Sequence, residues 1–154
     1  MATIDDLISV LRDVKGTEYL WYEGYDGQWW GPPEYMDGSG WSATDVYNAG
    51  TNCSGLFNWG LQQVGLSPVG GTPDYWQLAT EGIDSNWEAV YSPGQFVITM
   101  SGNQGHMAMV SGYGDNLLIQ ADTYYSNVNE NHYLWNQQPY VYYEYVGWIP
   151  GLDW

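Results

Sequence analysis

The order in which helical and strand-like patterns follow one another constrains the fold of this chain more than any other feature of its sequence. Apolar residues recur at helical spacing over 3–15 and again over 53–64. Short alternating segments bounded by Gly, Pro and Asn follow, and they predict strands at 95–100, 106–111, 116–121 and 141–148. Helices followed by hairpin-linked strands are typical of the α+β class, so we expect N-terminal helices packed on a central antiparallel sheet.

Three further segments complete this prediction. A short helix is expected over 73–80, with Thr72 as its cap and Pro in the first turn. Residues 23–50 lose periodicity and are rich in Gly, Pro and aromatic side chains, which is typical of a long binding loop inserted in a compact domain. Residues 123–139 are polar and are expected to form a loop as well.

Size and charge limit the function classes. The 154 residues suit a single domain spanning 1–154. Eighteen acidic residues face only two basic ones, Arg12 and Lys15, which gives a net charge of −16. Neutralising phosphates requires Lys and Arg, so we expect no nucleic-acid partner, and anionic membrane surfaces are disfavoured. No apolar run reaches the roughly 18 residues of a membrane span, so we expect no membrane partner. We also expect the protein to be a monomer.

Aromatic side chains are unusually frequent, with ten Trp and fifteen Tyr. Such side chains offer large flat faces with one polar tip and suit stacking on sugars or peptides, although they also fill β-rich cores. Trp29, Trp30, Tyr35 and Trp41 lie in the irregular segment 23–50 and are candidates for a substrate-binding wall. A loop packed on its own aromatic side chains is the alternative.

Cys53 is the only cysteine and lies where the second predicted helix begins. The positive end of a helix stabilises a thiolate, and a thiolate is a far better nucleophile than a thiol. His106 opens a predicted strand and is the candidate base that takes the thiol proton. The alternatives are a small buried cysteine and a structural histidine. One Cys and two His are too few for a structural zinc site, so we expect no metal.

Gln120 is the candidate residue for orienting the histidine. If 106–111 and 116–121 pair as a hairpin, Gln120 comes back near His106, and its carbonyl oxygen can hold the imidazole by its other nitrogen. Asp115 and Asp122 are rival candidates, and a plain surface strand residue is the alternative for Gln120. His132, in a polar segment, is interpreted as a surface histidine.

Five short segments, taken in chain order, resemble the signature segments of the NlpC/P60 family of cysteine peptidases, which have a papain-like fold. They lie at 16–21, 52–56, 93–97, 105–110 and 118–121. The second, Asn-Cys-Ser-Gly-Leu, resembles the family's Asp-Cys-Ser-Gly-Leu nucleophile segment, with Asn52 in place of the Asp. The fourth resembles the family's Gly-His segment, and the fifth places Gln120 where the family carries the residue that orients the histidine.

The resemblance implies a peptidoglycan hydrolase that cuts an amide bond of the bacterial stem peptide, usually the bond joining γ-D-glutamate to diaminopimelate or lysine. By this resemblance Cys53 attacks the carbonyl carbon and forms an acyl-enzyme. His106 acts first as base and then as acid, and Gln120 holds His106. The chemistry requires no metal and no organic cofactor.

The resemblance also implies substrate-binding roles near the nucleophile. Tyr19 matches a family tyrosine near the cleft, and its hydroxyl is expected to bind the oxyanion together with the backbone N–H of Cys53. Asn52 and Ser54 flank the nucleophile and are candidates for contacting the stem peptide.

A further resemblance is to peptidase domains of tailed-phage lysins and tail-associated hydrolases. It rests on the segments 68–72 and 103–106 and on the Cys-Ser-Gly motif. No signal peptide is visible. We therefore expect either the host cytoplasm, with holin-type release to the cell wall, or a virion-associated enzyme. The alternatives are an N-acetylmuramoyl-L-alanine amidase or a transferase on the same fold, and a non-catalytic aromatic-rich cell-wall-binding or phage structural protein.

Overall fold

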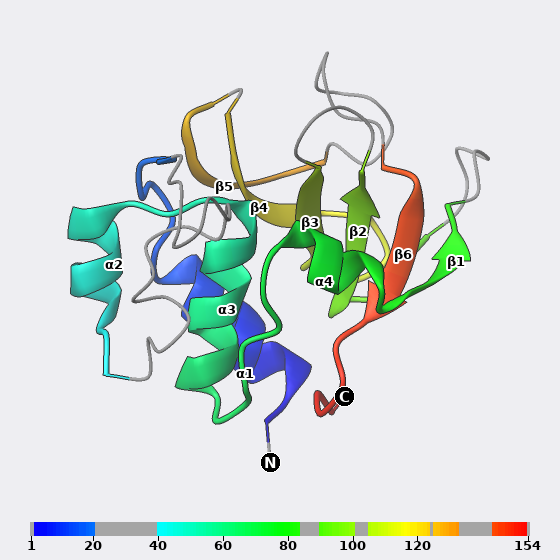
Figure 1. The fold of residues 1–154 in the computed structure, drawn as a ribbon, viewed down its shortest axis with the longest axis horizontal. Coiled ribbons are helices and arrows are strands. Elements are labelled where there is room, and N and C mark those ends of the chain that lie inside the picture. The colour runs from blue at the N-terminus through cyan, green and yellow to red at the C-terminus, as the bar shows by residue number, and fades with distance from the viewer. Residues whose placement is uncertain are drawn as a thin grey trace.

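The computed structural model describes residues 2–20, 40–83, 90–100, 105–123, 125–132 and 143–153. The helices in this part of the chain are α1 (Ile4–Arg12), α2 (Ala43–Ala49), α3 (Cys53–Gln63) and α4 (Thr72–Trp76). The strands are β1 (Ala79–Gly82), β2 (Gln95–Thr99), β3 (His106–Val110), β4 (Leu118–Asp122), β5 (Asn127–Asn131) and β6 (Tyr145–Trp148). Helices α1, α2 and α3 stand together beside the sheet, and α4 lies in front of its centre (Figure 1). The predicted α+β class is confirmed.

The six strands form one antiparallel sheet in the order β1-β6-β2-β3-β4-β5. The strands β2, β3, β4 and β5 lie side by side in chain order, while β6 returns to pair between β1 and β2. In the predicted hairpin, Met109 of β3 lies opposite Ile119 of β4. This pairing carries residues of β4 back toward the beginning of β3, as the hairpin prediction requires.

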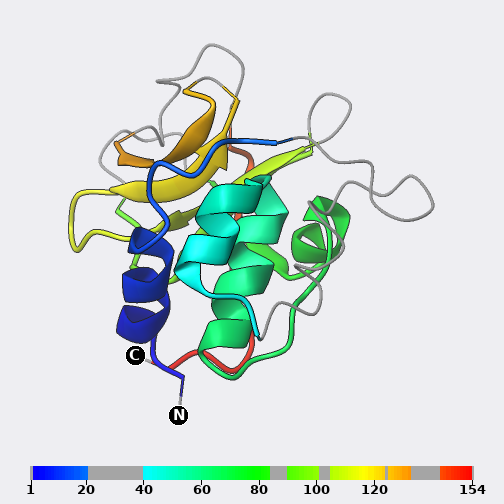
Figure 2. The same cartoon turned by 90° about the vertical axis from the view of Figure 1, so that its left-hand side faces the viewer.

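Alternating side chains of the central strands divide between two apolar clusters, because successive residues of a strand point to opposite faces. Phe96, Met107 and Met109 belong to the larger cluster, which contains the apolar faces of α1 and α3. Val97 and Ala108 belong to the smaller cluster on the other face. Figure 2 shows α1 and α3 standing in front of the sheet. The sheet is therefore the layer against which α3, the helix that begins at Cys53, is packed.

Gly60 allows α1 and α3 to approach closely. A Cβ added at Gly60 would lie 2.7 Å from Leu11 and 3.0 Å from Leu7, and both leucines are fully buried on α1. The apolar stripe of α1 therefore packs directly against the backbone of α3, which fixes the axis of the helix that begins at Cys53.

Two predicted segments differ from the structure before residue 83. Helix α2 lies inside the segment predicted as irregular, because Ser42 and Asp45 form a reciprocal capping box that supports a short helix with one buried residue, Val46. Residues 23–39 of that segment lie outside the described residues. The third predicted helix begins one residue earlier than expected, with Gly71 as its cap, and ends at Trp76. Strand β1 takes the place of its last turn by backbone pairing with β6.

The second half also contains a strand that the sequence did not predict. Strand β5 lies in the segment expected to be a polar loop, and it pairs with β4 along its whole length. Only Val128 of this strand is buried, so the apolar alternation used to recognise strands is missing. Strand β4 starts at Leu118 rather than 116, since Asn116 has a positive φ of 53°. Strand β6 starts at Tyr145 rather than 141, and residues 141–142 lie outside the described part.

Both basic residues of the chain bind one carboxylate on β5. Arg12 and Lys15 donate to Glu130 at 2.7 Å and 3.1 Å, and Ser111 donates to it at 2.6 Å. The Glu130 side chain is only 7% exposed. Burial alone would raise the pKa of this carboxyl, but the three donors and the positive charges lower it to about 2. Among the described residues, no helix is long and apolar enough to cross a membrane.

Candidate active site

Cys53 is the first residue of α3, and Asn52 caps that helix. The Asn52 side-chain oxygen accepts a hydrogen bond of 2.7 Å from the backbone N–H of Gly55. The Cys53 side chain is 2% exposed and points toward the sheet side of the helix, where it belongs to the larger apolar cluster. The predicted position of the nucleophile at a helix N-terminus is therefore present.

His106 begins β3 directly after a glycine in a left-handed conformation. Gly105 has a φ of +71°, and a Cβ added to it would lie 2.9 Å from the Thr99 carbonyl oxygen and 3.0 Å from the Thr72 methyl group. Thr99 is also the β2 partner of His106 in the sheet. Only glycine fits so close to these atoms in a left-handed conformation. Gly105 therefore fixes where β3 begins and thereby positions the His106 imidazole.

Gln120 holds His106, as the hairpin prediction expects. The imidazole Nε2 of His106 donates to the Gln120 side-chain oxygen at 2.7 Å. The same oxygen accepts a second hydrogen bond of 2.8 Å from the hydroxyl of Tyr143, and the Tyr143 ring lies 6.1 Å from the imidazole centroid. Gln120 is fully buried, so this acceptor is fixed in place. With Nε2 engaged, Nδ1 is the imidazole nitrogen left for Cys53.

The Cys53 thiol and the His106 imidazole form a coupled pair. Burial alone would raise the pKa of the thiol, but the hydrogen bond and positive charge of His106 lower it below its ordinary value. Burial alone would lower the pKa of His106, while its contacts with Cys53 and Gln120 raise it. Both directions favour a thiolate beside an imidazolium, which is the reactive form of such a pair.

Two further polar groups lie against the sulfur, and neither is a candidate site residue from the sequence. The Thr72 hydroxyl oxygen lies 3.6 Å from the Cys53 sulfur. The backbone N–H of Met107 also hydrogen-bonds the sulfur and helps to lower the thiol pKa. Thr72 was predicted only as a helix cap, because no sequence pattern connects it to a residue nineteen positions away. Tyr143 was missed for the same reason.

Tyr19 and Asp122 lie close enough to the pair to act on it electrostatically. Burial, then the charge of the Cys53 thiolate, then that of Asp122 raise the pKa of the Tyr19 hydroxyl, so it remains a proton donor. The Asp122 carboxylate also contributes to raising the pKa of His106. Asp122 is 1% exposed and accepts from the Tyr125 backbone N–H and the Asn129 amide, both at 2.7 Å. It therefore supplies negative charge to the site from a fixed position.

Two of the predicted substrate-binding residues are buried beside Cys53. Asn52 and Ser54 are fully buried, and within the described residues the Asn52 amide nitrogen and the Ser54 hydroxyl have no hydrogen-bond partner. Trp29 and Trp30, like Tyr35, lie outside the described residues. Asp115 is not an orienter of His106, since it binds the exposed His132 at 3.2 Å.

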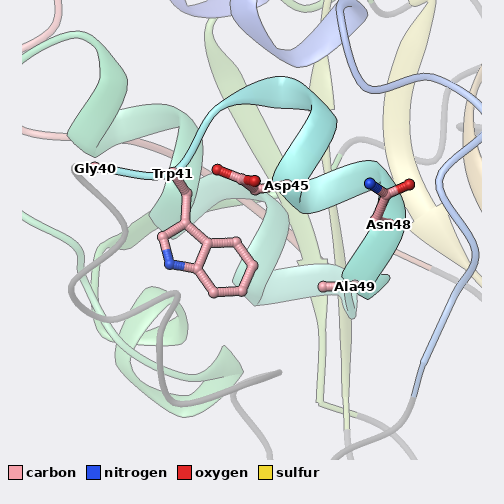
Figure 3. Close-up of a pocket in the computed structure, with 5 residues that line it drawn as sticks. All are labelled: Gly40, Trp41, Asp45, Asn48 and Ala49. Carbon is pink, nitrogen blue, oxygen red and sulfur yellow. The ribbon is translucent and has the colours of Figure 1, made fainter.

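Trp41 lies at a hollow of about 540 Å³ beside α2. The indole ring, the Asp45 carboxylate and the Asn48 amide surround this hollow, with Gly40 and Ala49 completing its lining (Figure 3). A flat aromatic face next to planar polar groups is an arrangement that suits a sugar ring or a peptide. Among the described residues, no group of three or more His, Cys, Asp or Glu could hold a metal ion.

Comparison with solved structures identifies the fold. No protein-family profile and no curated protein sequence matches this chain. The NlpC/p60 domain of the peptidoglycan hydrolase SagA superposes with a TM-score of 0.58 at 16% identity, and the match covers 96% of this chain and 100% of that domain. The P60 domain of the antigen MAP1204 from M. avium subspecies paratuberculosis gives 0.60 at 18% identity, covering 95% and 93%.

A third similar structure is NlpC2 from Trichomonas vaginalis, with a TM-score of 0.59 and 16% identity. The match covers 96% of this chain and 47% of that protein, so this chain spans about half its length. These likenesses extend over almost the whole chain. The predicted papain-like NlpC/P60 fold is therefore confirmed, with Cys53 at the start of α3 and the helices on an antiparallel sheet.

Proposed function

We propose that this protein is a cysteine peptidase that hydrolyses an amide bond in the stem peptide of bacterial peptidoglycan. The observation that carries the proposal is the connected set of Cys53, His106 and Gln120 on an NlpC/P60 fold. The His106–Gln120 bond of 2.7 Å fixes one imidazole nitrogen and leaves the other for the thiol. The name of the similar SagA structure, a peptidoglycan hydrolase, supports the class of substrate.

The first chemical step follows from the ionised pair. The Cys53 thiolate attacks the amide carbonyl carbon, and the carbonyl electrons move onto oxygen. The imidazolium of His106 then donates its proton to the amide nitrogen as the C–N bond breaks, which releases the amine and leaves a thioester. Gln120 keeps the ring in one orientation while its charge changes. It is neutral, so the fixed Asp122 carboxylate provides the negative charge that favours the imidazolium.

The oxyanion formed in this step needs donors. The backbone N–H of Cys53 lies in the first turn of α3, where helix geometry leaves such groups without an intrahelical acceptor. Tyr19 is the second candidate donor, because its hydroxyl pKa is raised and it carries its proton at neutral pH. In the second half of the reaction, neutral His106 takes a proton from water, the hydroxide adds to the thioester, and the Cys53 thiolate leaves.

The bond between γ-D-glutamate and a diamino acid is the proposed cleavage site. Diaminopimelate and lysine carry an ammonium group, and a protein with a net charge of −16 favours a cationic group near its cleft. Both basic side chains of the chain are already bound to Glu130, so recognition of the substrate falls to neutral donors and to carboxylates.

The hollow at Trp41 is the proposed contact for the part of the substrate that precedes the stem peptide. Ala49 lines the hollow and lies four residues before Cys53, so the extended chain between them spans at most about 14 Å. The stretch from a muramic acid to the γ-D-glutamyl carbonyl is about 10 Å on the same scale. A sugar stacked on Trp41 is therefore compatible with a stem peptide that reaches the nucleophile.

We also propose a role as a phage lysin, supported by the resemblance of segments 68–72 and 103–106 to such enzymes. In this role the protein would act on the wall after holin-type release from the host cytoplasm, or as part of a virion. Expression in a bacterial cytoplasm is then expected to be tolerated until the inner membrane is permeabilised, when the culture should clear. Clearing without permeabilisation would contradict release by this route.

A soluble muramoyl-tetrapeptide tests the cleavage site, since it contains both the lactyl–alanine amide and the γ-D-glutamyl–diaminopimelate amide. Product masses after incubation with wild type and Cys53→Ala identify the bond. A muramoyl-dipeptide ending at γ-D-glutamate, absent with Cys53→Ala, is expected. Release of the intact tetrapeptide would instead identify an amidase, and binding without any product would indicate a non-catalytic wall-binding protein.

A further inference from the structure

Thr72 lies against the nucleophile although it belongs to a different helix. Its hydroxyl oxygen is 3.6 Å from the Cys53 sulfur, within the range of a hydrogen bond to sulfur, and its side chain is almost fully buried. It is the first residue of α4, directly after Gly71. The Thr72 methyl group faces Gly105, as the 3.0 Å approach to an added Cβ shows, so the side chain is confined on both sides.

The position of Thr72 is set by a buried amide on α3. Asn58 donates to the Gly70 carbonyl at 2.8 Å and accepts from the backbone N–H groups of Val69 and Gly70 at 3.1 Å and 3.3 Å. It also accepts from the Tyr75 hydroxyl at 2.7 Å. These bonds tie the segment before α4, and α4 itself, to the helix that carries Cys53. The hydroxyl of Thr72 is therefore held at a fixed place relative to the sulfur.

The groups around the Cys53 sulfur and the His106 imidazole differ in charge and in hydrogen-bonding capacity. His106, from β3, supplies a positive charge to the sulfur, and Asp122, from β4, acts with its negative charge on His106. The hydroxyls of Tyr19, Tyr75 and Tyr143 all feel the charge of the thiolate, which raises their pKa values behind the larger effect of burial. Among these neighbours Thr72 offers a hydroxyl that hydrogen-bonds the sulfur itself.

We propose that the Thr72 hydroxyl donates a hydrogen bond to the Cys53 thiolate and is a functional part of the active site. The inference rests on the proposed role of Cys53 as nucleophile. Together with the Met107 backbone N–H, the Thr72 hydroxyl adds neutral hydrogen-bond donors to the positive charge that His106 supplies to the sulfur. These donors stabilise the thiolate before it attacks the substrate and again when it leaves as the thioester breaks down. No covalent bond to Thr72 forms or breaks.

The test uses a matched pair of substitutions. Thr72→Val keeps the shape of the side chain and removes the hydroxyl, whereas Thr72→Ser keeps the hydroxyl and removes the methyl group. Thr72→Ala is the substitute hydroxyl-free variant if Thr72→Val does not fold. Because Cys53 is the only cysteine, thiolate absorbance near 240 nm, corrected with Cys53→Ala, reports its ionisation without any substrate. The kcat and KM for the muramoyl-tetrapeptide are measured in parallel.

The donor role predicts opposite results for the two substitutions. Thr72→Val should shift thiolate formation to higher pH by about one unit, which is a tenfold loss of thiolate in the lower part of the titration curve. It should also lower kcat with little change in KM. Thr72→Ser should stay near wild type in both measurements. An unshifted thiolate curve in the hydroxyl-free variant would overturn the proposal. So would Thr72→Ser being impaired while Thr72→Val is not, since packing of the methyl group would then explain the contact.

This experiment separates two kinds of failure. If the wild type hydrolyses nothing, the proposed function fails, while the absorbance comparison still decides whether Thr72 donates to the sulfur. If the wild type hydrolyses the substrate and the thiolate curve ignores Thr72, only the inference about Thr72 fails.

Discussion

Asn58 is expected to be one of the most sensitive positions of the chain although it touches no substrate. Its side chain is fully buried on α3 and makes four hydrogen bonds to the segment 69–70 and to Tyr75. Each such bond contributes roughly 0.5–1.5 kcal/mol net, and the buried Tyr75 hydroxyl left without its acceptor adds to the loss. Asn58→Ala should therefore lower the free energy of unfolding by about 4 kcal/mol, a large part of the 5–15 kcal/mol typical of a domain.

Urea unfolding followed by tryptophan fluorescence measures this change, and Tyr75→Phe is the matched control. Tyr75→Phe removes one of the four bonds and leaves the ring in place, so it should lower the free energy of unfolding by about 1 kcal/mol. A loss below about 1 kcal/mol for Asn58→Ala would refute the reasoning. Equal losses for the two variants would show that the Tyr75 contact alone matters, and the other three bonds would then contribute nothing measurable.

Three further predictions follow from the geometry. Glu130→Gln should lower stability at pH 7 by about 1–2 kcal/mol, after allowance for its half-exposed basic partners. The pKa of Glu130 is depressed from 4.5 to about 2, so the stability difference between wild type and Glu130→Gln should shrink as the pH falls from 4.5 to about 2 and vanish below that. A stability difference that stays constant over this pH range would contradict the ion cluster. Tyr143→Phe removes one of two donors to Gln120 and should lower kcat several-fold with KM unchanged, whereas a changed KM alone would place Tyr143 in substrate binding. Trp41→Ala should raise KM for glycan-linked substrate but not for free stem peptide. Tyr47→Ala, which removes an exposed aromatic side chain on the adjacent helix α2, should change neither KM.

The fold was predictable where local pattern and tertiary structure agree. The helices α1 and α3 were predictable from their apolar stripes, and the strands β2 and β3 from their apolar alternation. The predicted ends of these elements differ from the observed ends by at most three residues. Strand β5 escaped detection because backbone pairing with β4 and a polar ladder, rather than apolar alternation, hold it in the sheet. Within that ladder Asn131 donates to Asn129 at 2.7 Å. Helix α2 escaped because one buried residue makes no periodic signal.

The same distinction applies to the site. Cys53, His106 and Gln120 each stand at a recognisable place in the sequence, namely a helix start, a strand start and the returning strand of a hairpin, so their meeting could be predicted. Thr72 and Tyr143 reach the site through contacts that no spacing encodes. The sequence predicts Asn52 and Ser54 as contacts for the stem peptide but does not indicate their burial, which the capping geometry and packing of α3 produce.

The central claim is that Cys53 cuts stem peptides. It is tested most directly by digesting purified diaminopimelate-type and lysine-type walls with wild type and Cys53→Ala, and by determining the masses of the soluble products. The geometry predicts fragments ending at γ-D-glutamate from at least one wall type, with none from Cys53→Ala. The absence of any Cys53-dependent product from both walls would contradict the proposed function.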